Sequence, residues 1–240
     1  MRIYGINPVL EALRAGRVTA IHVSTRADDR LTEIVGLATA RGIPIRRANI
    51  DELNRFSHRG RHQGVVADVG DQKAFGVDDL IAGARGAPLV VVLDQIEDPH
   101  NVGAILRTVD VAGADGVVRQ SRHAARLDGA AAKASAGAVS HVRVAEVVNV
   151  ARALDDLKNG GVWTVGLAGD APKRYDEIDF TLPTAIVLGS EGSGLRRLVR
   201  ERCDWLASIP VRGHVESLNV SVAAGIVLFE AIRQRNLPRP

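Results

Sequence analysis

The stretch "PLVVVLDQIEDPHNVGAILR" (residues 88–107) decides the fold, because it changes abruptly from one kind of secondary structure to another. Its opening run, "PLVVVL", is continuously apolar, which is typical of a strand buried on both faces of a sheet. Asp98 is then a natural N-cap and Pro99 suits the first helical position, so a helix is predicted to start here. The stretch therefore predicts one strand-to-helix unit of an α/β protein.

The same alternation continues to the end of the chain. Further strands are predicted at about 115–119, 141–144, 161–167, 183–189 and 204–210, and helices at about 99–112, 126–136, 145–158, 194–202 and 219–234. Apolar strands joined by helical crossovers indicate a mostly parallel sheet with both faces covered. Such sheets bind ligands at the carboxyl ends of their strands.

The first part of the chain predicts a separate, smaller α/β unit over residues 1–70. Leu31, Ile34, Val35 and Ala38 have helical spacing, which predicts a helix from Ala27 to Arg41. It is flanked by the strand-like runs "AIHVS" and "GIPIRRA", and "HQGVVADV" is a further strand candidate. Residues 71–87 are expected to be a linker with one short helix, and residues 88–240 the larger domain.

Composition excludes several classes of protein. Of 240 residues, 46% are hydrophobic and only 3% aromatic, so we expect a substantial aliphatic core. No apolar run approaches the roughly 20 residues that a membrane span needs, and the start lacks the apolar core of a signal peptide. The single cysteine, Cys203, excludes an intrachain disulfide and a cysteine-based zinc site. We therefore expect a cytoplasmic protein without a membrane partner.

Charge is distributed unevenly. Residues 1–73 carry 12 Lys/Arg and 8 Asp/Glu, whereas residues 74–240 carry 19 and 20. This surplus fits either an anionic partner or a simply solvated surface. In the basic loop "SHRGRH", His58 and His62 have a spacing open to a metal pair, but RNA contact or solvation is favoured, and no metal is expected.

Three loops at predicted strand ends carry polar residues. The first contains Asn101, Gly103 and Arg107; the glycine is expected to leave room beside the arginine, one turn away on the same helix face. The third, "IPVRGHVESLNVS", contains Ser217 and Asn219 just before a helix that is apolar or small on every side. Such a helix is expected to be buried on more than one side. Taken singly, these polar residues also fit ordinary capping and surface roles.

The second loop, "GSEGSGLRRL", is rich in glycine, which allows positive φ and close backbone approach to a ligand. It lacks the dinucleotide fingerprint and the Lys-Ser/Thr of a P-loop. Glu191 at its centre would repel a pyrophosphate. The loop therefore favours a ligand with a cationic or hydroxyl group, although an ordinary glycine turn fits it too.

Together the three loops resemble the motifs of the SpoU/TrmH branch of the SPOUT RNA methyltransferases. The motifs occur in the family's order, here "DPHNVGAILRTVDVAG", "VLGSEGSGLRRL" and "SIPVRGHVESLNVSVAAGIVLFEA". The front end, with "YGINPVLEAL" and "HQGVVA", resembles the substrate-binding domain of bacterial 23S rRNA guanosine-2′-O-methyltransferases. The resemblance implies a trefoil-knotted, mostly parallel α/β domain, a small N-terminal α/β substrate-binding domain, and a homodimer.

The resemblance also implies a cofactor, a substrate and a site. S-adenosylmethionine would be held largely by backbone groups of Gly189, Ile209 and Leu218, with the loop at Ala168 beside the adenine. The substrate would be 23S rRNA, free or in a precursor large-subunit particle.

Catalytic roles also follow from the resemblance. Arg107 would activate the ribose 2′-hydroxyl, either as a base or as a cation that stabilises developing alkoxide charge. Asn101 would position the arginine or the ribose, and Glu191, Ser217 and Asn219 would orient the substrate and the loops. In the basic N-terminal domain, Arg59, Arg61 and His62 would dock the RNA.

Alternatives remain at this stage. The same reaction on a tRNA or on another rRNA nucleotide fits the shared motifs equally well. A catalytically silent RNA-binding assembly factor is disfavoured by the intact polar residues of the motifs. A nicotinamide-dependent dehydrogenase is disfavoured by the missing dinucleotide fingerprint.

Overall fold

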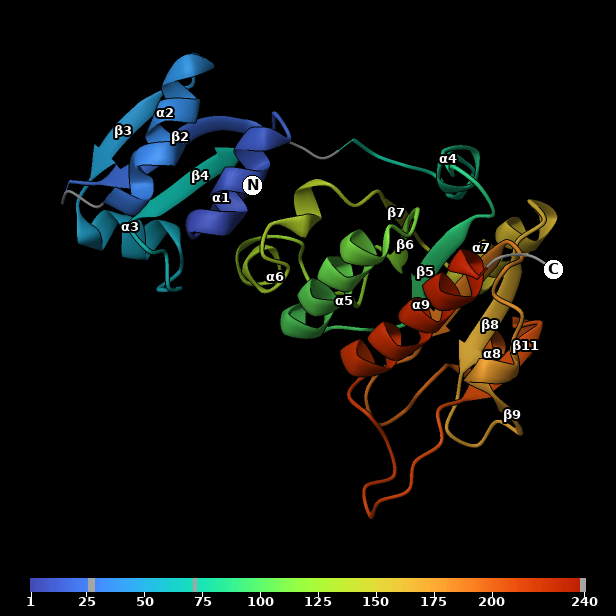
Figure 1. Cartoon of the computed structure of the whole chain (residues 1–240). Coiled ribbons are helices and arrows are strands. Elements are labelled where there is room, and N and C mark those ends of the chain that lie inside the picture. Colours follow the sequence, from blue (N-terminus) through green and yellow to red (C-terminus); the bar gives the residue numbers. More distant parts are fainter. Residues whose placement is uncertain (26–28, 71–72, 238–240) are drawn as a thin grey trace. The chain divides into compact units, whose positions relative to one another are not determined.

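The computed structural model describes residues 1–25, 29–70 and 73–237 (Figure 1). The described residues form two compact units. The first contains Met1–Lys73 with the later segments Val102–Arg107 and Arg126–His141, and the second contains Ala74–Asn101, Thr108–Ala125 and the chain from Val142 onward. The predicted domain boundaries at residues 70 and 88 stay a prediction.

The first unit contains a four-stranded sheet in the order β1 (Arg2–Tyr4), β4 (Val65–Val69), β2 (Val18–Ser24) and β3 (Ile45–Ala48). β2 and β3 are parallel, and the other pairs are antiparallel. The accompanying helices are α1 (Ile6–Arg14), the 3₁₀ turn η1 (Asp29–Leu31), α2 (Thr32–Ala40) and α3 (Ile50–Phe56). The small N-terminal α/β unit is confirmed.

Some local predictions in this unit need revision. In the described part of the helix predicted from Ala27 to Arg41, residues 29–31 form a 3₁₀ turn rather than an α-helix; Ala27 and Asp28 lie outside the described residues. α3 was not predicted, although Asn49 and Glu52 form a reciprocal capping box at its start. A helix this short has too few residues for its apolar periodicity to be recognised.

α5 (Pro99–Ala112) has the predicted bounds, with Asp98 as N-cap: its carboxylate accepts a hydrogen bond from the His100 N–H at 3.0 Å. The expected role of Gly103 was wrong. A Cβ at this position would lie 2.5 Å from Cβ of Ala134 in α6 (Gly129–Ala134) and 2.7 Å from the Ala131 carbonyl oxygen. The glycine therefore allows two helices to touch closely, rather than leaving room beside Arg107.

Within its described residues, the second unit contains a seven-stranded sheet whose pairings are all parallel. Its order is β7 (Val144–Val147), β6 (Gly116–Gln120), β5 (Leu89–Leu93), β10 (Thr184–Leu188), β8 (Trp163–Leu167), β11 (Trp205–Ser208) and β9 (Lys173–Arg174). The predicted mostly parallel sheet is confirmed. A trefoil knot is a property of the whole backbone path rather than of strand pairing, and it stays a prediction.

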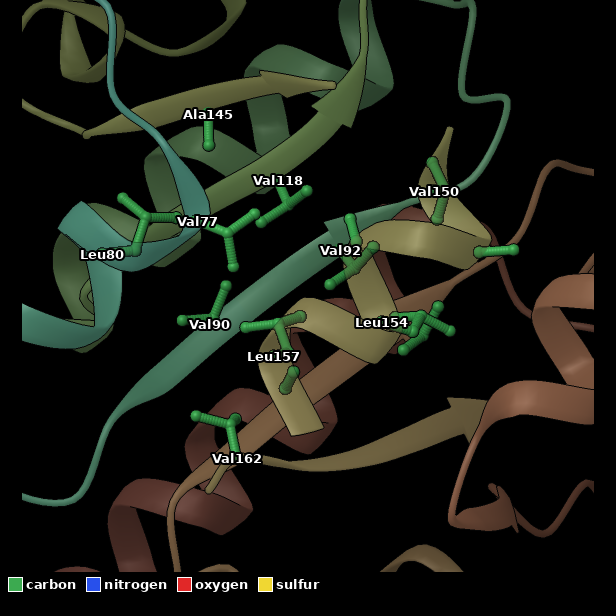
Figure 2. Close-up of a cluster of buried hydrophobic side chains, with 14 of the residues drawn as sticks. Val77, Leu80, Val90, Val92, Val118, Ala145, Val150, Leu154, Leu157 and Val162 are labelled. Carbon is green, nitrogen blue, oxygen red and sulfur yellow. The ribbon is translucent and has the colours of Figure 1, made fainter. Parts of the chain in front are cut away.

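One face of this sheet is covered by α4 (Val77–Ala82), α7 (Val150–Asn159) and α8 (Arg197–Arg202). Figure 2 shows Leu154 and Leu157 of α7 packed against Val90 and Val92 of β5. Side chains alternate along a strand, so the intervening Val91 points to the opposite face. On that face α9 (Val220–Asn236) packs on β10. Both faces of the central strands are therefore buried.

Several details of the second unit differ from expectation. The helix predicted at about 145–158 begins at Val150, because residues 145–147 are paired in β7. β7 begins at Val144 instead of residue 141, because the 3₁₀ turn η2 (Ala138–Ser140) precedes it and Val144 is the residue that pairs with Val117. The short edge strand β9 was not predicted. In the predicted linker, α4 is the expected short helix, while Asp71 and Gln72 lie outside the described residues.

α9 is only partly covered by the chain itself. Val220, Ala224, Val227, Leu228 and Ala231 are buried, but Val222 and Phe229 are each 50% exposed. The expected burial on more than one side is therefore not achieved within the described chain. Among the described residues, no helix combines the length and apolar character required to cross a membrane.

Candidate active site at the carboxyl ends of the parallel strands

A cavity of about 670 Å³ lies where three neighbouring strands of the large sheet end. Leu188 ends β10, Leu167 ends β8 and Ala207 lies near the end of β11, and all three line the cavity. Most of the remaining walls come from the segments that follow these strands: residues 168–170, residues 189–195, and Ile209, Val211 and residues 216–220. This is the position that a parallel sheet offers to a ligand, and the volume suits a drug-sized molecule.

The cavity is predominantly acidic. Asp170, Glu191 and Glu216 line it, against one guanidinium, that of Arg200. Arg200 is already paired with Asp170 through two hydrogen bonds of 2.9 Å, and this pairing lowers the pKa of the Asp170 carboxyl. Because Asp170 and Arg200 offset each other, Glu191 and Glu216 give the cavity its net negative charge. Such a lining favours a cationic or zwitterionic ligand over a polyphosphate.

The predicted cofactor contacts all lie on this cavity. Gly189, Ile209 and Leu218 line it, and so does Ala168. Leu218 is 40% exposed, as expected of an apolar side chain that faces a hollow rather than the core. The structure therefore brings together the positions that the second and third motifs had singled out.

The glycine loop is held in a tight turn by its own backbone. Ser190 and Gly194 exchange backbone hydrogen bonds of 2.9 and 3.1 Å, and Gly192 and Gly194 have φ of 86° and 65°. At Gly189 an added Cβ would lie 2.2 Å from the Gly194 carbonyl carbon. Positive φ is confirmed at Gly192 and Gly194. At Gly189 a side chain is excluded by the backbone of the loop itself, and not only by the expected approach of a ligand.

Asn219 connects all three motifs. Its side-chain oxygen accepts hydrogen bonds from the N–H of Ser221 (2.9 Å) and Val222 (3.4 Å), so it is the N-cap of α9. Its amide nitrogen donates to Oδ1 of Asn101 (2.9 Å) and Oε1 of Glu191 (2.6 Å). The side chain that was predicted to belong to the site is thus also a helix cap, and its role in the site stays a prediction.

An ion pair between a buried carboxylate and a partly exposed arginine, which the sequence did not reveal, anchors the glycine loop. Asp94, fully buried just after β5, accepts hydrogen bonds from the Arg196 backbone N–H (2.9 Å) and from its Nε (2.7 Å). Arg196 also donates to Oε1 of Gln120 at 3.2 Å. A carboxylate directly after an apolar strand was the available signal, but its partner lies a hundred positions away.

The other predicted residues are placed as follows. Arg107 is exposed on α5, the helix that also carries the buried Asn101. Ser217 is exposed and lines the cavity. No group of three or more His, Cys, Asp or Glu side chains that could hold a metal ion occurs in the part of the chain that the structure describes.

In the first unit, Arg59 and Arg61 are exposed, and His62 is half-buried. Burial, together with the nearby Lys133 ammonium, lowers the pKa of His62, and its Nδ1 accepts a hydrogen bond from the Gly64 N–H at 3.0 Å. A lowered pKa keeps this imidazole neutral at neutral pH. His62 therefore offers a hydrogen-bonding ring rather than a positive charge.

Comparison with known families gives two matches. Residues 88–229 match the SpoU rRNA Methylase family, and residues 2–73 match a family described as RNA 2′-O ribose methyltransferase substrate binding. The chain is 42% identical over 244 residues to the 23S rRNA (guanosine-2′-O-)-methyltransferase RlmB of Pseudomonas syringae pv. tomato, covering 99% of this chain and 97% of that protein.

Solved structures give the same picture. The SpoU methyltransferase AviRb from Streptomyces viridochromogenes, in complex with the cofactor AdoMet, has a TM-score of 0.83 and 27% identity, covering 98% of this chain and 90% of that one. The TrmH/SpoU tRNA modifying enzyme of A. aeolicus has a TM-score of 0.58 and 32% identity, but covers only 66% of this chain and 82% of its own.

The ion pair of Asp94 and Arg196 is expected to contribute to stability. Arg196→Ala removes the guanidinium from the buried Asp94 carboxylate and leaves it the backbone N–H of residue 196, so the free energy of unfolding should fall by about 1–3 kcal/mol in urea denaturation. Arg197→Ala, which removes only a surface pair with Glu201, should cost less than about 1 kcal/mol. Equal losses in the two variants would contradict the anchoring role.

Proposed function

The chain belongs to the SpoU rRNA Methylase family, and we propose that it transfers a methyl group from S-adenosylmethionine to the ribose 2′-hydroxyl of a guanosine in 23S rRNA. The observation that carries this proposal is the acidic cavity at the strand ends, where Asn219 joins the three motif loops. The near-complete coverage by a 23S rRNA enzyme favours this substrate. The A. aeolicus tRNA enzyme, in contrast, covers only two thirds of the chain. Action on rRNA implies the cytoplasm as the place of work.

The cavity suits the cofactor in size and charge. Apolar side chains of Leu188, Ile209 and Leu218 can enclose an adenosine, and the backbone at Gly189 offers hydrogen-bonding groups. When bound, the cofactor supplies a methyl group on a positively charged sulfur, which Glu191 and Glu216 would stabilise through their negative charge.

In the proposed reaction the ribose oxygen forms a bond to the methyl carbon, the carbon–sulfur bond breaks, and the hydroxyl proton is released. An arginine side chain keeps its proton at neutral pH, so we assign Arg107 the role of a cation that binds the RNA and stabilises the developing negative charge. Asn101 lies on the same helix, and its fixed contact with Asn219 makes it a positioning residue.

RNA docking is assigned to the N-terminal domain. Arg59 and Arg61 are exposed cations, suited to phosphate contacts that hold folded RNA without reading its sequence. Both Arg59 and the neighbouring His58 have positive φ, so the loop presents its side chains from a constrained backbone. His62 would contribute through its neutral ring.

A homodimer completes the proposal. Val222 and Phe229 of α9 and Val111 of α5 are at least half exposed, and Gly225 of α9 lies beside Thr108 of α5. Apolar side chains exposed in this way on a helix that is apolar on every side are expected at an interface between copies of the chain. The dimer would supply the second covered side of α9.

The substrate assignment is tested by methyl transfer from radiolabelled S-adenosylmethionine to unmodified 23S rRNA and, in parallel, to bulk tRNA. We expect label at a single guanosine ribose of 23S rRNA, located by nucleotide mapping. Label in tRNA would overturn the substrate but keep the chemistry. Cofactor binding without any transfer would support a silent RNA-binding factor instead.

Arg107→Ala should reduce the rate of transfer by at least about 100-fold, because it removes the cation that opposes developing charge. Cofactor affinity, measured by calorimetry, should stay within a few-fold of the original. Arg152→Ala, an exposed arginine on α7, is the matched control and should transfer normally. Full turnover by Arg107→Ala would remove this residue from the mechanism.

Phe229→Glu places a charge on the proposed interface, so sedimentation velocity should detect a shift from dimer to monomer. Val148→Glu makes the same kind of change at a side chain that is 89% exposed, and should leave the dimer intact. A Phe229→Glu protein that stays dimeric, or an original protein that is monomeric, would refute the assigned interface.

A further inference from the structure

A second cavity, of about 310 Å³, lies within the first unit and is used by none of the steps above. Its lining combines planar cations, aromatic rings and carboxylates: Met1, Arg2, Tyr4, Phe56, His58, Asp68, Arg126, Asp128 and Gly129. Aromatic residues are rare in this chain, at 3% of its length, so two aromatic rings beside a histidine in one small cavity are noteworthy. The volume is at the lower end of the range for ligand sites.

Arg2 contacts both an aromatic ring and a carboxylate in this cavity. Its guanidinium carbon lies 4.3 Å from the centroid of the Phe56 ring, so the cation covers one face of the ring. Its Nε donates to Oδ1 of Asp68 at 2.8 Å, and the other Asp68 oxygen lies 2.9 Å from Nε2 of the buried His22. The Arg2 side chain is nevertheless 45% exposed. The guanidinium plane is thus held in place but remains accessible.

Sheet pairing explains why these groups meet. Arg2 and Tyr4 point to the same face of β1, and Arg2 is the pairing partner of Asp68 on β4. β1 is an edge strand, so no further strand covers Arg2 on its outer side among the described residues. Phe56, at the end of α3, packs onto the cluster around Tyr4. Neighbouring elements thereby fix the aromatic and cationic groups.

Opposite charges lie side by side at the cavity. Nε of Arg126, a side chain that is 87% exposed, is 3.0 Å from Oδ2 of Asp128. A carboxylate beside a stacking surface can accept hydrogen bonds from the N–H groups of a base, and an exposed arginine can bind the neighbouring phosphate. A free phosphate fits less well, since Asp68 and Asp128 would both repel it.

We propose that this cavity binds an unpaired nucleobase of the RNA substrate, stacked on the guanidinium plane of Arg2. Proteins recognise single-stranded RNA by stacking bases on aromatic rings or on arginine planes and by hydrogen bonds to the base edges. The proposal rests on the proposed function only for the nature of the ligand. Asp68 acts as a positioning residue, because it orients Arg2.

The test uses the full chain, without cofactor, and a fluorescently labelled single-stranded decaribonucleotide of mixed sequence. Arg2→Lys keeps the charge but removes the planar surface, so affinity measured by anisotropy should fall on the order of 10-fold. The dependence of affinity on salt should be unchanged, because no phosphate contact is lost. Phe56→Leu should weaken binding similarly, and Phe56→Tyr should restore it.

Two matched variants separate stacking from charge. Arg46→Lys, on β3 at the opposite edge of the sheet, should bind as the original protein does. Arg59→Ala, which removes a cation assigned to phosphate, should instead lower the slope of log affinity against log salt by about 0.7. An abasic strand, which has the same backbone but no bases, is also tested. Its affinity for the original protein should be as low as the affinity of the intact strand for Arg2→Lys.

Full affinity of Arg2→Lys, equal binding of the abasic and intact strands, or no binding of the intact strand to the original protein would each overturn the proposal. Thermal unfolding of every variant shows whether a loss of binding reflects a loss of folding. Because the readout is binding in the absence of cofactor, a protein that binds the strand as expected but transfers no methyl group would refute only the proposed function.

Discussion

The site depends on the orientation of one amide, that of Asn219. Its oxygen caps α9, and its nitrogen donates to both Asn101 and Glu191. An aspartate could cap the helix but has no N–H to donate, and a serine has only one hydroxyl. Asparagine therefore satisfies at once the helix end and the two loops that face it. Through this one residue, the start of α9 contacts both the start of α5 and the glycine loop.

The sheet supplies the place of the site, and the loops supply its chemistry. Parallel pairing brings the ends of β10, β8 and β11 to one edge, whatever side chains follow them. The acidic lining then comes from Glu191 and Glu216, in the loops that follow two of these strands. Asp94 links the sheet to the loops, because it directly follows the core strand β5 and binds Arg196 in the glycine loop. The sheet thus determines where the cavity lies, and the loops provide its charge.

Local signals predicted much of this structure, and distant contacts were missed. The bounds of α5 followed from Asp98 and Pro99, which act within one helical turn. β1 is too short to show a period, and the start of β7 is fixed by its partner strand rather than by its own sequence. The motif loops identified the residues around the cavity, but not the ion pair of Asp94 and Arg196. No local pattern joins two residues so far apart in the chain.

The contact between α5 and α6 at Gly103 carries a consequence for the history of the sequence. With a Cβ, residue 103 would overlap the Ala134 methyl group and the Ala131 carbonyl. A larger residue would fit at position 103 only if residues 131–135 lay farther from α5. If that segment lay farther away while residue 103 was still glycine, a void would remain between them. Neither change is neutral alone. Positions 103 and 134 are therefore expected to vary as a pair among relatives, and each restricts the substitutions open to the other.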